Sequence, residues 1–275
     1  MTARKIRRIL GWFMAFTLAL LYVPLLAVAV LSFNSARRGY VWKGFTTQWY
    51  HELFQNEHIL EMMRNTLILA SVSTVIATVL GTLLAIGMSR FPWPKWFRGC
   101  LNFLVFLPVV TPDIIFGAAA IVVFGLLKGY LSIFQPGLFV MILAHVTFQI
   151  SFVALVVNSR LASIGNAVQE AARDLYANTW QVFYRVLLPL LMPGIVSGAM
   201  LAFILSLDDF VISFFTYGPE STTLPIFIYA SAKRGISPDI LALSTLIFFI
   251  TFLLVMGLEL FTRYGKDKDH EKAKS

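Results

Sequence analysis

The sequence has few groups suited to covalent or metal chemistry. Its one cysteine, Cys100, excludes a disulfide within the chain, and no second histidine or cysteine stands at ligand spacing from His145. The ATP-binding pattern G-x-x-x-x-G-K-[ST] is absent, and so are the enzyme patterns H-E-x-x-H and G-x-S-x-G. We therefore expect no catalytic residue, no bound metal and no ATPase activity in this chain, and an enzyme is the least favoured class.

Charge is also scarce, and long apolar runs take its place. Charged residues make up 13% of the chain and hydrophobic residues 58%, and the mean hydropathy is +0.78. These values differ strongly from those of soluble domains, so the sequence predicts an all-α integral membrane protein. Each apolar run reaches the roughly 20 residues that a helix needs to cross a bilayer. The six predicted transmembrane helices are Leu10–Leu31, Thr66–Met88, Cys100–Leu127, Leu138–Val157, Leu190–Phe214 and Ile240–Phe261.

The distribution of basic residues predicts how these helices are oriented. If the N-terminus is cytoplasmic, 15 of the 22 Lys and Arg residues fall on the cytoplasmic side and 7 on the other side. The positive-inside rule therefore favours cytoplasmic N- and C-termini. The net charge of +8 follows from this topology and from contact with anionic membrane lipid, so it does not require a nucleic-acid partner.

A polar segment, Glu170–Pro189, interrupts the apolar pattern between the fourth and fifth predicted helices. It must lie in water because it separates two spans, and the orientation above puts it in the cytoplasm. Apolar residues recur at helical spacing on both sides of Asn178, so we expect two short amphipathic helices joined near that residue. Such a pair is suited to docking another protein, and an ordinary cytoplasmic connector is the alternative.

The spacing within this segment resembles the EAA loop of ABC importer permeases, and we call it the EAA-like loop. The matching positions are Glu170-Ala171-Ala172, Tyr176, Val186 and Leu188-Pro189. One position departs, because the family usually has glycine where this chain has Tyr176. Glycine permits a positive φ between the two helices. We therefore expect Tyr176 either to keep a right-handed conformation or to shift the break to Asn178, which tolerates the left-handed region better.

Three acidic residues, Asp113, Asp208 and Asp209, lie within predicted spans. A carboxylate is costly there unless it faces water, a partner or a ligand. The helical rise places Asp113 about 20 Å and Asp208 about 27 Å from the cytoplasmic ends of their spans, in the outer half of the membrane. Adjacent helical positions point about 100° apart, so Asp208 and Asp209 are not expected to face one partner together. The sequence thus predicts an acidic zone in the outer half of the membrane, near the outer gate of a pathway through it.

Each of these polar residues also has a simpler interpretation. Asp113 follows Pro112 and is suited to cap a restarted half-helix. Asp208 and Asp209 are also compatible with simple hydration at the interfacial end of their span. His145, within the fourth span, fits a hydrogen-bonded packing residue better than a metal ligand.

Longer stretches narrow the family resemblance. They are SFNSARRGYVWKGFTTQWY, LPVVTPDI, AHVTF, EAARDL, AFILSLDDFVISFF and TTLPIFIY. Together they resemble the second permease subunit of spermidine/putrescine importers, from about the first predicted span to the sixth. The resemblance implies a type I ABC importer permease fold in a bacterial inner membrane. It also implies a single permease domain over residues 1–275, with a cytoplasmic coupling loop over residues 158–189.

The resemblance also implies roles for particular residues. A polyamine path is implied for Asp113, Asp208 and Asp209, with Tyr217 and Tyr229 as weaker candidates, because carboxylates and aromatic rings bind ammonium groups. Coupling to an ATPase is implied for a larger set in the EAA-like loop. This set is Glu170, Ala171, Ala172, Asp174, Leu175, Tyr176, Val186, Leu188 and Pro189.

The implied partners are three. They are a cytoplasmic ABC ATPase dimer that binds ATP and Mg, a second six-span permease and a periplasmic polyamine-binding protein. This chain would then hold no cofactor of its own and would form half of the translocation pathway. The competing class is a secondary transporter or cation channel that uses the same acids. The lack of repeated halves and the presence of a docking loop count against that class.

Overall fold

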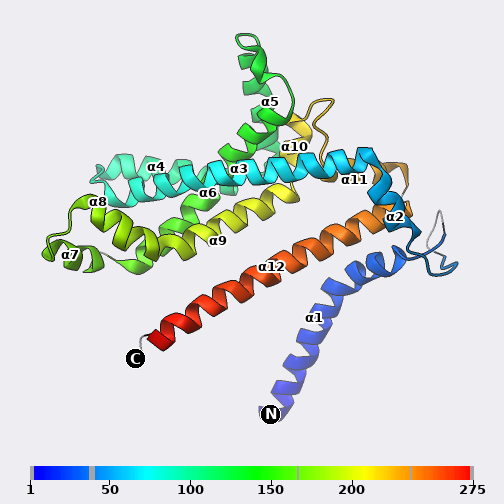
Figure 1. The fold of residues 1–275 in the computed structure, drawn as a ribbon, viewed down its shortest axis with the longest axis horizontal. Helices are drawn as coiled ribbons and strands as arrows, with labels where there is room; N and C mark the ends of the chain where they lie inside the picture. Colours follow the sequence, from blue (N-terminus) through cyan, green and yellow to red (C-terminus); the bar gives the residue numbers. More distant parts are fainter. Residues whose placement is uncertain (1–2, 37–40, 166, 236, 273–275) are drawn as a thin grey trace. The chain divides into compact units, whose positions relative to one another are not determined.

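A computed structural model describes residues 3–36, 41–165, 167–235 and 237–272 (Figure 1). Within these residues the chain is helical, and the one β-contact is an isolated bridge between Asn34 and Phe45. The chain divides into two compact units, one made of Met1–Leu60 with Ile228–Ser275 and the other of Glu61–Phe227. The all-α class is confirmed, and the single domain over residues 1–275 stays a prediction.

The first unit is built on α1 (Ala3–Leu31), α2 (Gln48–Gln55) and α12 (Pro238–Lys272). α2 packs on α12 and buries Trp49 on its inner side. The Trp49 indole donates to the backbone oxygen of Asn34 at 2.8 Å, and the hydroxyls of Ser32 and Tyr50 lie 2.6 Å apart. These bonds tie the segment that follows α1 to α2.

The second unit is organised around three long helices. They are α3 (Glu57–Arg90, all but its first residues), α6 (Leu138–Ile164) and α9 (Leu188–Leu207). The helices approach closely at glycines. A Cβ at Gly81 would lie 2.8 Å from Val153 Cβ, and one at Gly194 would lie 2.7 Å from Arg160 Cβ. Membrane helices associate through such small residues because close packing replaces the hydrophobic drive that lipid removes.

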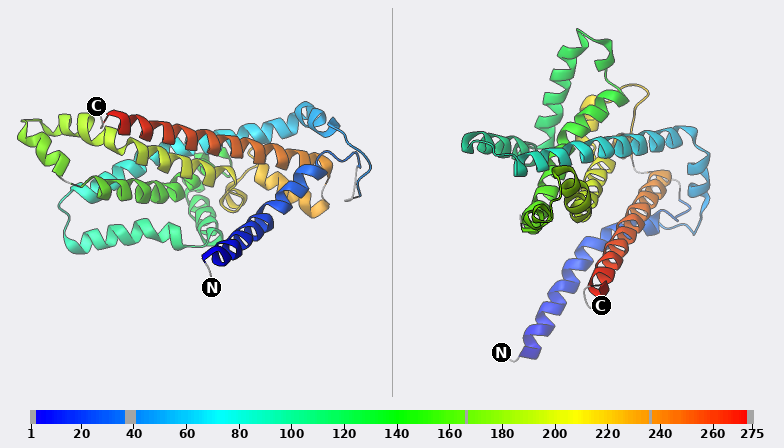
Figure 2. Two further views of the ribbon diagram at one scale, coloured as in Figure 1. Left: turned by 90° about the horizontal axis from the view of Figure 1, so that it is seen from below. Right: turned by 60° about the vertical axis from the view of Figure 1, so that its left-hand side comes forward.

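The third predicted span is broken into two helices. α4 (Lys95–Val110) and α5 (Asp113–Lys128) meet at a bend of 108°, and α5 turns sharply away from α4 (Figure 2). Pro112 explains the break, because proline lacks a backbone N–H and disfavours helix at the residue before it. Cys100–Leu127 is therefore not one continuous helix. A short 3₁₀ helix, η1 (Ser132–Phe134), then leads into α6.

The fifth predicted span ends early. α9 stops at Leu207, residues 208–210 are not helical, and α10 (Val211–Thr216) follows. An unbroken helix over Leu190–Phe214 is therefore wrong, and the break falls on two aspartates, whose short carboxylates compete for backbone N–H groups. α10 packs against α5, where a Cβ at Gly117 would lie 2.7 Å from Phe215.

Four helices in the described residues are long and apolar enough to cross a membrane. They are Ile9–Leu31, Glu57–Arg90, Leu138–Ile164 and Thr179–Leu207. The bent pair α4–α5 raises the number to five if it is one span, and Pro238–Leu253 is a shorter apolar helix. The prediction of several spans is thus confirmed, and the number six stays a prediction.

Candidate functional site

The two aspartates after α9 face different surroundings. Asp208 follows the helix directly, and its side chain is exposed. The Asp209 side chain is 10% exposed, and its carboxylate accepts the backbone N–H groups of Ile212 at 3.2 Å and Ser213 at 2.8 Å. Asp209 therefore serves the first turn of α10, whose N–H groups have no partner within their own helix. The expectation that the two acids are successive positions of one helix is wrong.

A histidine from α6 holds the inward acid from the other side. His145 Nε2 lies 3.2 Å from Asp209 Oδ2, and His145 is 2% exposed. An ionised carboxylate only accepts hydrogen bonds, so Nε2 must carry the hydrogen. A buried carboxylate needs partners of this kind, because burial without them is costly. Both oxygens of Asp209 are thus engaged within the protein.

Asp208 and Asp113 are both exposed. Asp113 is the first residue of α5, with Pro112 in the cap position, and its side chain is exposed. Its helix, α5, packs against α10, the helix that follows Asp208. Two exposed carboxylates repel each other, and a cation between them relieves that repulsion. Of the three predicted acids, Asp113 and Asp208 are exposed at the breaks that precede α5 and α10, two helices that pack together, and Asp209 turns toward His145.

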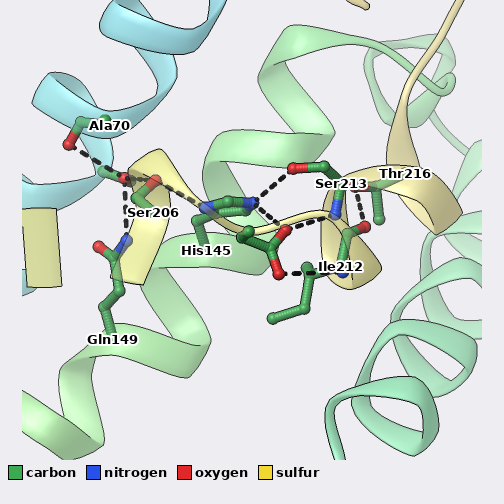
Figure 3. A network of polar contacts seen from close by, with 9 residues as sticks. Ala70, His145, Gln149, Ser206, Ile212, Ser213 and Thr216 are labelled. Carbon is green, nitrogen blue, oxygen red and sulfur yellow. Dashed lines mark hydrogen bonds and ion pairs between the residues drawn. The ribbon is translucent and has the colours of Figure 1, made fainter. Parts of the chain in front are cut away.

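His145 is also the centre of a buried polar network that sequence reasoning missed (Figure 3). Its Nδ1 lies 2.8 Å from Ser206 Oγ and its Nε2 3.1 Å from Ser213 Oγ. Ser206 Oγ lies 3.3 Å from Ser73 Oγ, which accepts from the Gln149 amide at 3.2 Å. The expected hydrogen-bonded packing role of His145 is confirmed. Its partners Ser206 and Ser213 lie 61 and 68 residues away, a separation that no local pattern reveals.

The two candidate tyrosines lie in different settings. Tyr217 follows α10 and belongs to the same unit as the acids, and its ring centre is 6.0 Å from that of Phe214. Tyr229 lies on α11 (Leu224–Arg234), and Lys233 Nζ stands 4.5 Å from its ring centre. A resident cation on that ring competes with a substrate ammonium group for the same face. Tyr229 is accordingly the weaker candidate.

The EAA-like loop forms two helices joined near Asn178, as predicted. α7 (Ala167–Asp174) precedes a turn, and α8 (Thr179–Gln181) begins with a capping box. The Asn178 side chain accepts the Gln181 N–H at 2.8 Å, and the Gln181 side chain accepts the Asn178 N–H at 2.9 Å. The chain then continues through a π-helical stretch, η2 (Val182–Leu187), into α9. In η2 the backbone N–H of Leu188 donates to the oxygen of Phe183.

Tyr176 takes the left-handed conformation that the sequence predicted it would avoid. Its φ is 60°, whereas Asn178 has φ −72°. The Ala177 N–H returns to the Ala172 oxygen at 3.1 Å, and the Tyr176 N–H returns to the Arg173 oxygen at 2.9 Å. This is the Schellman pattern, which ends a helix with one left-handed residue. Both expected alternatives for Tyr176 are therefore wrong, because the end of α7 sets the conformation.

The remaining coupling candidates are distributed over the surface of the loop. Those that are exposed are Glu170, Ala171, Asp174, Leu175 and Pro189, and those that are half-buried are Ala172, Val186 and Leu188. A cavity of about 360 Å³ lies between α3, α7 and the helix that starts at Thr179. Its charged lining residues are Arg90, Glu170 and Arg173. The loop thus exposes both apolar and charged groups.

Broken apolar helices, exposed acids at the breaks and a two-helix polar loop are typical of a membrane-spanning importer permease. Residues 77–264 match the family described as "Binding-protein-dependent transport system inner membrane component", and the chain belongs to this family. The match favours an importer permease over a secondary transporter or a channel.

Named relatives show which members of the family this chain is similar to. The spermidine/putrescine transport system permease protein PotC of Escherichia coli (strain K12) is 36% identical over 259 residues, covering 94% of this chain and 95% of PotC. The putrescine transport system permease protein PotI of the same strain is 40% identical over 232 residues, covering 82% of this chain and 81% of PotI. A chain of a bacterial ABC transporter involved in the import of the acidic polysaccharide alginate has the same fold. It has a TM-score of 0.74 at 20% identity, with 94% of this chain and 95% of that chain covered.

Proposed function

We propose that this chain is the permease subunit of an ATP-driven polyamine importer and that Asp113 and Asp208 line the substrate path. The observation that carries the proposal is that these two exposed carboxylates stand at the breaks of two apolar helices, next to α5 and α10, which pack together. A polyamine bears ammonium groups separated by methylene chains, so it requires acids placed along a path. The names of PotC and PotI agree with this substrate class.

The position of Asp208 at the end of α9 strengthens its attraction for a cation. The last carbonyl groups of a helix have no partners within it and carry a partial negative charge. Broken helices in transporters bring such ends to the substrate. Asp209 supports this arrangement from within, and Tyr217, which is 38% exposed, offers an aromatic face in the same unit.

The substrate assignment predicts that neutralising either exposed acid weakens uptake. In vesicles that contain the complete transporter, we expect Asp208→Asn and Asp113→Asn each to raise the KM for spermidine about tenfold, the loss of roughly one charge-assisted contact. Glu220→Gln is the matched control, because Glu220 is an exposed acid in the same unit. Radiolabelled uptake measures the effect, and an unchanged KM in both aspartate variants would remove the assignment.

We further infer that the EAA-like loop docks on an ABC ATPase dimer, which holds the ATP and Mg. Leu175, Tyr176 and Trp180 are 82%, 97% and 69% exposed, and apolar side chains of this size gathered on one polar loop mark a docking surface. A second six-span permease would complete the pathway. A periplasmic polyamine-binding protein would deliver the substrate to the outer side.

Docking predicts that a charge change in the loop separates the ATPase from the permease. We expect Glu170→Arg to reduce ATPase co-purification about tenfold or more, because a reversed charge at an interface creates repulsion. Glu57→Arg, the same change in the first turn of α3, is the control. Full retention of the ATPase by Glu170→Arg would count against the docking role.

A further inference from the structure

We propose that His145 positions Asp209 and so determines which of the two neighbouring aspartates, Asp208 or Asp209, is exposed. By holding Asp209 inward, it leaves Asp208 as the exposed member of the two neighbouring aspartates. This inference rests on the proposed function, in which Asp208 and Asp113 bind a polyamine. The choice between the two neighbouring aspartates is not dictated by helical geometry, because residues 208–210 are not helical. Two backbone N–H groups of α10 hold Asp209 locally, and His145 adds the side-chain contact from another helix.

The imidazole of His145 makes contacts on both sides of the break. Ser206, two residues before Asp208, lies 2.8 Å from Nδ1. Asp209 Oδ2 and Ser213 Oγ, which follow Asp208, lie 3.2 Å and 3.1 Å from Nε2. The ring itself comes from α6 and is 2% exposed (Figure 3). One rigid, buried side chain thus connects the end of α9, the break and α10.

The two ring nitrogens differ in what their partners demand. Asp209 offers only acceptors when it is ionised, so Nε2 must donate. The Ser206 hydroxyl that faces Nδ1 can either donate or accept a hydrogen bond. Its other neighbour, the Ser73 hydroxyl at 3.3 Å, can also do either, so both hydrogens can be rearranged. The Nδ1 side is therefore adaptable, whereas the Nε2 side has a single solution. Control of Asp209 resides in the Nε2–H group.

This asymmetry separates a positioning role from a packing role. The amide nitrogen of glutamine reaches the place of Nε2, whereas the shorter asparagine reaches only the place of Nδ1. Both replacements remove the ring and both are polar. Volume alone also favours glutamine over asparagine, so the ranking of these two variants does not by itself separate the roles. If His145 positions Asp209, the ranking disappears when the Asp209 carboxylate is removed, whereas a residue that only fills space keeps it.

Uptake kinetics of the complete transporter in vesicles test this distinction. We expect His145→Asn to raise the KM for spermidine about tenfold, the size of one lost charge-assisted hydrogen bond, with a smaller change in Vmax per inserted protein. His145→Gln should restore most of the affinity and leave the KM within about threefold of the wild-type value. In an Asp209→Asn background the difference between the two variants should disappear. Equal KM values for His145→Asn and His145→Gln, or a difference that persists without the Asp209 carboxylate, would overturn the proposal.

A second measurement needs no substrate and therefore separates this inference from the proposed function. In a Cys100→Ser background the chain has no native thiol, and Asp208→Cys reports how position 208 faces water. We expect a water-soluble maleimide to label this thiol at least about threefold more slowly with His145→Asn and at the unchanged rate with His145→Gln. If His145→Asn does not accumulate, His145→Met, which has no donor, replaces it. Absence of polyamine uptake by the wild-type complex would refute the proposed function. The labelling rates would still test the role of His145, because equal rates with His145→Asn and His145→Gln would refute that role.

Discussion

At the scale of single residues, Tyr176 bears a backbone cost that glycine would not. A side chain in the left-handed region costs about 1–2 kcal/mol, whereas glycine in an ordinary conformation costs about 0.5–1 kcal/mol. Tyr176 has φ 60° and is 97% exposed, so removal of its side chain forfeits no packing in this chain. We expect Tyr176→Gly to slow proteolytic cleavage within the EAA-like loop by up to about fivefold, because cleavage follows local opening.

The neighbouring Leu175 provides the control for this prediction. It is 82% exposed and is not among the residues with positive φ. Leu175→Gly should therefore increase cleavage, since the added chain freedom brings no relief of strain. Faster cleavage with Tyr176→Gly than with Leu175→Gly would contradict the left-handed conformation. A more stable loop in Tyr176→Gly need not give faster transport, because Tyr176 is also one of the residues proposed to dock the ATPase.

The sequence predicted the acids but not how they are divided. Depth along the helices placed Asp113 and Asp208 in the same outer half of the membrane, and the structure leaves both exposed at the breaks of their spans. The buried Asp209 contacts His145, which lies 64 positions earlier and on another helix. Hydrophobic pattern and spacing describe a residue and its sequence neighbours. They contain no information on a partner that only the packing of α6 against α10 supplies.

At the scale of helical elements, Gly117 permits the contact between α5 and α10. A Cβ there would lie 2.7 Å from Phe215 Cδ2, a distance that side-chain carbons do not adopt without movement. We expect Gly117→Ala to lower the unfolding free energy by about 1–3 kcal/mol through overpacking. Thermal unfolding of the purified protein measures this loss.

Gly125 is the matched control on the same helix. A Cβ there meets nothing within 4 Å. Gly125→Ala should stabilise α5 by about 0.5–1 kcal/mol, because alanine loses less backbone entropy than glycine in a helix. If both variants unfold at the same temperature, α5 does not pack on α10 as described.

Helices were predictable from sequence where local signals determine them. The two helices of the EAA-like loop have apolar residues at helical spacing and an Asn178 cap, and both are present. The breaks in the third and fifth spans were harder, because a broken and a continuous helix have the same apolar composition. Pro112 marked the first break. The aspartates that mark the second were interpreted instead as residues of one long helix.

At the scale of the whole molecule, the charge bias predicts which side of the membrane each loop faces. In a Cys100→Ser background we expect a thiol at Leu175→Cys to react with an impermeant maleimide only after the cell membrane is opened. A thiol at Ser132→Cys, in η1 on the side predicted to be outside, should react in intact cells. Both positions are exposed, so accessibility is matched. Labelling of Leu175→Cys in intact cells would show that the loop lies outside the cell, which excludes docking to a cytoplasmic ATPase.

The class of the molecule was the most secure prediction. Composition alone predicted a helical membrane protein, and the family match over residues 77–264 agrees. The EAA-like pattern narrowed this to importer permeases through its resemblance to the loop of that family. The arrangement of the outer acids depends on long-range packing, and a pattern of residues along the chain does not determine it.

The π-helical stretch Val182–Leu187 between the EAA-like loop and α9 has a consequence for changes in chain length. Such a stretch accommodates an additional residue without altering the helix on either side. Deletion of one residue inside it would restore regular winding and keep the loop in phase with the face that α9 presents to α6. Deletion of one residue further along α9 would rotate the two by about 100°. The π-helical stretch thus allows the chain to lose one residue there without rotating the EAA-like loop relative to α9.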